Sequence, residues 1–259
     1  MDVTERRRTG NEAARARRRL TLIADASLRI GTTLDLEQTA REPAEVCVPD
    51  LAVEVGGDWF DAIPLAGDKT ALVVGDVMGS GINAAATMGR LRTATRAYAD
   101  LDLSPTEILE RLDHTTTRLE EAIATCAYAV HDPHRARCRI SLAGHLPPAL
   151  VRPGRAPQLL DLPTGAPLGV GGIPFQTTPF DLGPGDRLVL YTDGLVETRD
   201  QAVDQHLNTL LGLLDDPERP LEETCDRLLH ALRRPDDHDD VALLVAQVRP
   251  LPDHQASRP

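Results

Sequence analysis

Aromatic residues are scarce in this chain of 259 residues, where phenylalanine, tyrosine and tryptophan together account for 3%. Apolar residues still make up 41%, so a core has to be built from leucine, valine, alanine and isoleucine. The length suits one large domain with a short extension, or two small domains. We therefore expect a globular fold around an aliphatic core.

Cysteine and long apolar runs are also scarce. The four cysteines show no Cys-x-x-Cys spacing and no apolar signal sequence precedes them, which favours a cytoplasmic chain with reduced, buried thiols. No apolar run approaches the ~20 residues that a membrane-spanning helix needs. We therefore expect no transmembrane segment.

Positive charge is the third shortage. The 28 lysines and arginines face 40 aspartates and glutamates, a formal net charge of −12. Residues 1–20, by contrast, carry a net positive charge. A basic segment of this kind can contact phosphate or anionic lipid, but it is more often a solvated terminus. Because an acidic chain is a poor general binder of nucleic acid, we expect no nucleic-acid partner.

Two patterns divide the chain. Residues 12–47 carry apolar side chains at helical spacing, whereas the remainder alternates short apolar runs with turn signals, as β-strands do. Within that strand series, helices are predicted over 81–100 and from the capping-box sequence SPTE at 104–107. Two more are predicted over 201–214 and 220–233. This order favours an α+β fold in which two sheets pack face to face with helices outside.

The stretch ALVVGDVMGSGINAA, residues 71–85, places one carboxylate, Asp76, among three glycines at the end of an apolar run. A Walker-type phosphate loop is excluded because no lysine follows the glycines. The dinucleotide fingerprint is nominally present at 79–84, but its acidic partner would fall between two helices and Asp76 would repel a pyrophosphate. The remaining alternative is a metal ion, because a strand-end aspartate can reach Mg²⁺ or Mn²⁺.

Further acids adjoin predicted buried strands. Asp58 follows two glycines in EVGGDWFD, and Asp193 precedes a glycine in LYTDGLVE. Asp239 and Asp240 stand before the last strand, in PDDHDDVALLV. Any one of them is more often a turn or cap residue. Packed together, however, four strand-edge acids would repel one another strongly unless cations neutralise them.

Six motifs follow one another between about residues 53 and 248: GGDWFD, GDVMGSG, AGHLPPAL, TGAPLGV, LYTDGLVETR and DDVALL. In this order they resemble the bacterial branch of the metal-dependent PPM (PP2C-like) serine/threonine phosphatases, of the SpoIIE/RsbU type. The resemblance implies a four-layer α-β-β-α sandwich with a two-metal centre at one end. It also implies hydrolysis of phosphoserine on a protein, with a phosphorylated anti-sigma-factor antagonist as the substrate.

The resemblance assigns the metal ligands. Asp58 and Asp76 match the acids that hold and bridge two Mn²⁺ or Mg²⁺ ions, and the Val77 carbonyl matches a backbone ligand. Asp193 and Asp239 match the remaining carboxylates, and we expect Asp240 to point elsewhere. Two such ions about 3.5–4 Å apart share a water, lower its pKa and direct the resulting hydroxide at phosphorus. The four aspartates are therefore the predicted catalytic residues.

Other matched positions carry supporting expectations. His145 is expected to be a hydrogen-bonded turn residue, and Asp61 to lie just behind the metal ligands. Gly75 and Gly79 are expected to clear space for the carboxylate that faces metal. Ser80 stands where the family usually has histidine, from which we expect reduced or altered activity rather than none.

The N-terminal part departs from the family. Residues 25–51 resemble the opening helices of a GAF sensor domain, and the catalytic motifs follow almost at once. We therefore expect a helical segment over 1–50, a phosphatase domain over 51–250 that lacks its first strand, and a disordered tail over 251–259. One sheet edge would then be unpaired. Pairing of the N-terminal helices is one route to a homodimer, although such a stripe packs as often on its own domain.

Two hypotheses of different class follow. The first is a Mn²⁺/Mg²⁺-dependent protein-serine phosphatase. The second is a catalytically impaired binding or regulatory module that holds a phosphorylated partner, motivated by Ser80 and the expected missing strand.

Overall fold

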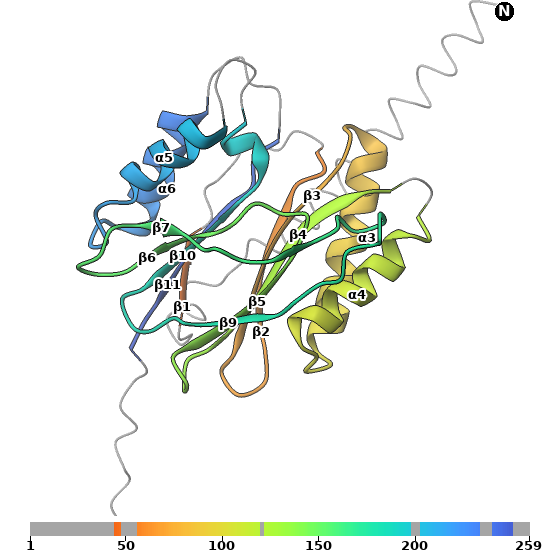
Figure 1. Cartoon of the computed structure of the whole chain (residues 1–259), viewed down its shortest axis with the longest axis horizontal. Coiled ribbons are helices and arrows are strands. Elements are labelled where there is room, and N and C mark those ends of the chain that lie inside the picture. The colour runs from red at the N-terminus through yellow and green to blue at the C-terminus, as the bar shows by residue number, and fades with distance from the viewer. Residues whose placement is uncertain (1–43, 48–55, 120–121, 198–202, 234–239, 251–259) are drawn as a thin grey trace, which may run out of the picture.

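The computed structural model describes residues 44–47, 56–119, 122–197, 203–233 and 240–250. Within them the chain forms two β-sheets that pack face to face, with one pair of helices on the outside of each sheet (Figure 1). The predicted α-β-β-α sandwich is confirmed. No helix in the described ranges combines the length and the apolarity needed to cross a bilayer.

Sheet A has five strands, and each pairs antiparallel with its neighbours. In spatial order they are β1 (Ala44–Cys47), β11 (Leu243–Val248), β10 (Arg187–Tyr191), β6 (Ala149–Val151) and β7 (Gln158–Leu159).

Strand β1 corrects the expectation of a missing first strand. Residues 44–47, assigned to a helical segment from their spacing, pair with β11 from Ala44 opposite Val248 to Cys47 opposite Val245. The local pattern failed because β11 offers an edge whose backbone groups need partners, and such a non-local ladder overrides a helical tendency. The remaining expectations for 1–43 (the GAF-like helices and dimer contact) and for the tail at 251–259 lie outside the described residues.

Sheet B has six strands. β2 (Trp59–Pro64), β3 (Thr70–Val77), β4 (Ala124–Asp132) and β5 (Arg137–Ala143) form an antiparallel series in which β4 and β5 make the predicted hairpin. Strand β8 (Thr164–Gly165) lies parallel to β5, and β9 (Thr178–Asp181) pairs with β5 antiparallel.

Helices cover the outer faces, as Figure 1 shows. On sheet B lie α3 (Ile82–Ala99) and α4 (Pro105–Thr116), and on the side of sheet A lie α5 (Val203–Leu213) and α6 (Leu221–Leu232). The predicted capping box begins α4.

Side chains along β3 alternate between two cores. Leu72 and Val74 point into the apolar layer between the sheets, whereas Ala71 and Val73 pack under α3 and α4. Leu190 of β10 and other aliphatic side chains of sheet A fill the same inner layer. The core is aliphatic, as the composition predicts. In both sheets the side chains that face the inner layer form rows that continue to the strand ends.

Candidate metal centre

Asp76 and Asp58 meet at one end of the inner layer. Asp76 continues the inner row of Leu72 and Val74, because side chains on a strand alternate between faces. Asp58 stands two residues before Phe60, which packs against the same inner core from the neighbouring strand β2. The two carboxyl groups lie within hydrogen-bonding reach of each other, and Asp76 contributes to raising the pKa of Asp58.

The environment of Asp58 opposes its negative charge. Burial has the largest effect, and the hydrogen bond and charge of Asp76 and the charge of Asp240 act in the same direction. A hydrogen bond from Thr192 acts against them, but the pKa of Asp58 is still raised from 3.8 to about 9. Carboxylates this close together repel one another unless a cation balances their negative charge.

The two glycines before Asp58 allow this crowding. A Cβ at Gly57 would lie 2.3 Å from the Val77 carbonyl oxygen, and one at Gly56 would overlap the Asp240 carboxylate at 1.8 Å. The Val77 amide also donates to the Gly57 carbonyl at 3.2 Å. The glycine pair thus brings the lead-in to β2 against both the Val77 carbonyl and Asp240.

The glycines around Asp76 have structural roles that differ from the predicted one of clearing space for its carboxylate. A Cβ at Gly75 would lie 2.3 Å from the indole of Trp59, so this glycine makes room for the tryptophan on the outer face. Gly79 and Gly81 have positive φ angles of 104° and 78° with open space around them, so they serve the loop conformation. Ser80 between them is exposed to solvent.

Thr192 connects the two sheets at this end, and the sequence analysis missed it. Its hydroxyl donates to Oδ2 of Asp58 at 2.6 Å and accepts from the Ala242 amide at 2.8 Å. The Thr192 amide donates to the Ala242 carbonyl at 3.0 Å, which extends the ladder between β10 and β11. The available signal was a hydroxyl residue directly before the aspartate of the TDG motif.

Asp193 follows Thr192 and begins a short 3₁₀ helix, Asp193–Leu195. Its Oδ1 accepts a hydrogen bond from the Gly194 amide at 2.9 Å. This places the third predicted ligand one residue beyond the threonine that holds Asp58.

The acid pair before β11 is described in part. Asp239 lies outside the described residues. Asp240 lies against Gly56 and near enough to Asp58 for its charge to raise the pKa of that carboxyl. Asp240 also has the strand parity of Ala242 and Leu244, which belong to the inner core.

The donor set suits a hard divalent cation. Asp58, Asp76 and Asp240 are oxygen donors, and the Val77 carbonyl lies beside them, which is the ligand chemistry of Mg²⁺ and Mn²⁺. No group of three or more His, Cys, Asp or Glu side chains in the described ranges stands ready-made for an ion.

Asp61 was expected behind the ligands and lies elsewhere. It shares the outer face of β2 with Trp59 and is 3% exposed. Arg96 of α3 donates to both of its oxygens, from Nε at 2.6 Å, and Nε of Arg92 lies 3.5 Å from Oδ2. The odd spacing from Asp58 to Asp61 turns the second carboxylate to the opposite side of the sheet.

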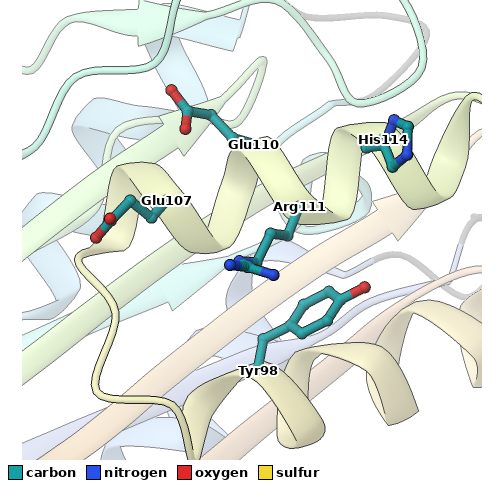
Figure 2. Close-up of a pocket in the computed structure, with 5 residues that line it drawn as sticks. All are labelled: Tyr98, Glu107, Glu110, Arg111 and His114. Atoms are coloured by element: carbon teal, nitrogen blue, oxygen red, sulfur yellow. The ribbon is translucent and has the colours of Figure 1, made fainter.

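A hollow between α3 and α4 is a separate feature, shown in Figure 2. Arg111 points from α4 toward Tyr98 of α3, with its guanidinium carbon 5.8 Å from the ring centroid. Glu107, Glu110 and His114 complete the lining. The hollow belongs to the helical layer outside sheet B, whereas Asp58 and Asp76 lie on the inner side of that sheet.

The chain has relatives of known sequence. The sequence model for Stage II sporulation protein E (SpoIIE) matches residues 66–249. The phosphoserine phosphatase RsbP of Bacillus subtilis (strain 168) is 28% identical over 207 residues, which cover 76% of this chain and 50% of RsbP. The phosphoserine phosphatase RsbU of the same organism is 27% identical over 177 residues, which cover 66% and 50%. The chain thus spans about half the length of these curated relatives.

Solved structures share the fold. The RsbU and RsbW domains of Rv1364c from Mycobacterium tuberculosis align with a TM-score of 0.68 and 35% identity, over 80% of this chain and 60% of that one. The PP2C phosphatase domain of SpoIIE from Bacillus subtilis, with a regulatory fragment, aligns with a TM-score of 0.67 and 17% identity, over 80% and 62%. The catalytic domain of the phosphatase PstP, solved with two manganese ions, aligns with a TM-score of 0.57 and 19% identity, over 80% and 97%.

Proposed function

The chain belongs to the SpoIIE family, and on that premise we propose that it is a metal-dependent protein-serine/threonine phosphatase. The observation that carries the proposal is the meeting of Asp58 and Asp76 at one end of the sandwich, beside Asp240 and the Val77 carbonyl. Half-buried carboxylates that lie this close together repel one another unless a bound cation balances their charge.

Each residue of the centre has a proposed role. Asp58, Asp76 and Asp193 would hold two Mn²⁺ or Mg²⁺ ions through their carboxylates, and the Val77 carbonyl would add a backbone ligand. Thr192 fixes the orientation of Asp58 through its hydroxyl. Bound ions of this kind supply a water of lowered pKa and neutralise charge on the phosphoryl oxygens. The proposed chemistry needs no cysteine, and Cys126, Cys138 and Cys225 are buried.

The proposed substrate is a phosphorylated anti-sigma-factor antagonist. RsbP and RsbU, which resemble this chain over 207 and 177 residues, are both phosphoserine phosphatases. The assignment of this substrate rests on family analogy.

The decisive experiment measures phosphate release from a phosphoserine protein with Mn²⁺, with and without EDTA. We expect activity in the wild type, loss with chelator, and loss in Asp76→Asn. Asp68→Asn is the matched control, because Asp68 is an exposed acid in the turn that leads into the same strand. Activity that survives both EDTA and Asp76→Asn would exclude the metal mechanism.

A catalytically impaired binding module is the rival function. One of the two observations that motivated this rival no longer holds, because β1 occupies the sheet edge that was expected to be empty. Ser80 in the histidine position still favours it. Calorimetry separates the two functions: tight binding of a phosphorylated partner without Mn²⁺ uptake would support the binding module.

The fourth carboxylate is one of the acids before β11. The family motif points to Asp239, whereas Asp240 lies beside Asp58. Single Asp→Asn substitutions at each position, followed by Mn²⁺ titration, assign the ligand as the position whose change abolishes binding.

A further inference from the structure

His145 lies in the connection that leads from β5 of sheet B to β6 of sheet A. It is 6% exposed, and both ring nitrogens have partners from different sheets. Nε2 lies 3.1 Å from the Tyr191 carbonyl oxygen, and Nδ1 lies 2.8 Å from the Thr125 hydroxyl. Because a carbonyl only accepts, Nε2 carries the proton and donates it, and Nδ1 accepts from Thr125.

Both partners stand directly beside the metal centre. Thr125 of β4 is the cross-strand partner of Asp76 in the ladder between β3 and β4. Tyr191 ends β10, and the next two residues are Thr192, which holds Asp58, and Asp193. The imidazole therefore joins the strand beside one predicted ligand to the strand that leads to another.

The connection is held to β10 at a second point. The Tyr191 hydroxyl donates to the Pro147 carbonyl at 2.8 Å, so Tyr191 contacts the connection through both its backbone and its side chain. Gly144, just before the histidine, has a φ of 60°, and a Cβ there would lie 2.5 Å from Pro167. The chain turns at a position that only glycine fills well, and the turn delivers His145 between the sheets.

Directional contacts matter here because most of the inner layer is aliphatic, and beside the Thr192–Asp58 hydrogen bond His145 is a second polar link between the sheets. Aliphatic contacts between sheets are non-directional, so they hold the layers together without setting the relative position of strand ends finely. A metal centre whose ligands come from two sheets needs those ends placed to within about 0.5 Å. Hydrogen bonds from one ring to both sheets supply that placement.

We propose that His145 is a positioning residue for the metal centre, which holds the Asp76 end of sheet B and the Asp193 end of sheet A in register through Thr125 and Tyr191. The inference rests on the proposed function. The ring acts as a neutral donor and acceptor, and burial favours that form by lowering the pKa of His145 to about 4. A glutamine amide also offers one donor and one acceptor, whereas alanine offers neither.

The experiment compares Mn²⁺ affinity, measured by calorimetry, in the wild type, His145→Ala and His145→Gln, with thermal stability recorded for each. Support for a metal site of this kind typically contributes about 10–100-fold in affinity. We expect a loss of that size in His145→Ala and recovery of most of it in His145→Gln. Initial rates should show a fall in kcat with little change in KM, because substrate contacts are left intact.

His131 provides the matched control. It is 1% exposed, lies at the far end of β4, and its Nε2 lies 3.1 Å from the Leu182 carbonyl oxygen. We expect His131→Ala to lower thermal stability and to leave Mn²⁺ affinity within about threefold of the wild type. Thr125→Val, which removes the partner hydroxyl with little change of shape, should weaken Mn²⁺ binding as His145→Ala does, and it replaces that variant if His145→Ala does not fold.

The outcomes separate the inference from the proposed function. A wild type that takes up no Mn²⁺ overturns both. A wild type that binds Mn²⁺ and releases phosphate, with His145→Ala or Thr125→Val unchanged in affinity, overturns the positioning role alone. Equal losses of affinity in the His131 and His145 variants would also overturn it, because the effect would then follow general stability.

Discussion

Asp58 and Asp61 stand three residues apart at the start of β2, and their surroundings have opposite charge. Asp61 faces α3 and pairs with Arg96 and Arg92. Asp58 faces the inner layer, where burial, followed by the neighbouring carboxyl of Asp76 and the charge of Asp240, raises its pKa. Two acids only three residues apart therefore differ: one has its counter-charge within the chain, and the charged neighbours of the other are acids.

The contrast distinguishes a structural acid from a functional one. A buried carboxylate beside an arginine is balanced when the chain folds, so it ties a helix to a sheet. A buried carboxylate beside other carboxylates keeps an unbalanced charge that only a proton or an added cation removes. Substitutions of the two acids should therefore differ in their effects on activity, pH dependence and stability.

Activity should differ most between the two positions. We expect Asp58→Asn to lower kcat/KM by roughly 10³-fold, because it removes a proposed metal ligand. Asp61→Asn should stay within about tenfold at a temperature where it is folded, since it contacts helix α3 and not the centre. Phosphate release with Mn²⁺ measures both variants, and equal losses would remove the distinction.

The metal-free protein should show an unusual pH dependence. With its pKa raised to about 9, folded Asp58 keeps a proton that the unfolded carboxyl has already lost above its usual 3.8. The stabilising effect is full below 3.8 and is lost as pH rises toward about 9, by up to about 1.4 kcal/mol per pH unit. Urea unfolding in EDTA should show this fall in the wild type relative to Asp58→Asn, and parallel pH profiles would contradict it.

Asp61→Asn should lower the stability of the fold, although we expect it to lower activity less than Asp58→Asn does. We expect Asp61→Asn to lower the free energy of unfolding by about 2 kcal/mol, less than for a fully buried ion pair because Arg96 is 46% exposed. Asp68→Asn in the β2–β3 turn is the control and should change it by less than about 0.5 kcal/mol, since Asp68 and His134 are both exposed. Unfolding in urea measures each variant with EDTA present.

The smallest effect is expected at Ser80. An imidazole there restores the residue usual in the family to the exposed loop after Asp76. We expect Ser80→His to raise kcat by less than about tenfold and Ser80→Ala to leave it unchanged. A large fall in Ser80→Ala would show that the serine has its own role beside the acid cluster.

Much of the fold follows from local sequence. The capping box at Ser104 predicted the start of α4, and there Glu107 Oε2 accepts from the Ser104 amide at 2.8 Å. The strand-end aspartates were recognised from their position after apolar runs, and Asp58 and Asp76 do come together. These features depend on backbone geometry over a few residues, which residue type largely controls.

The errors all involve partners that are distant in sequence. Strand β1 pairs with a strand some 200 positions away, which outweighs the helical spacing of its own residues. Asp61 was expected behind the metal ligands, but Arg96 and Arg92 of α3, packed on the outer face of sheet B, bind its carboxylate there. Gly57 rather than Gly75 makes room beside the Val77 carbonyl, because the close approach comes from another strand.

The order of motifs and the residue types at the strand ends were enough to indicate an oxygen-lined metal centre on an α-β-β-α sandwich. The packing of two sheets decided which groups share it. Thr192 reaches Asp58 across 134 residues, and His145 joins the strands beside Asp76 and Asp193. Burial and charge proximity set the pKa of Asp58, and both are properties of non-local packing that no local pattern records.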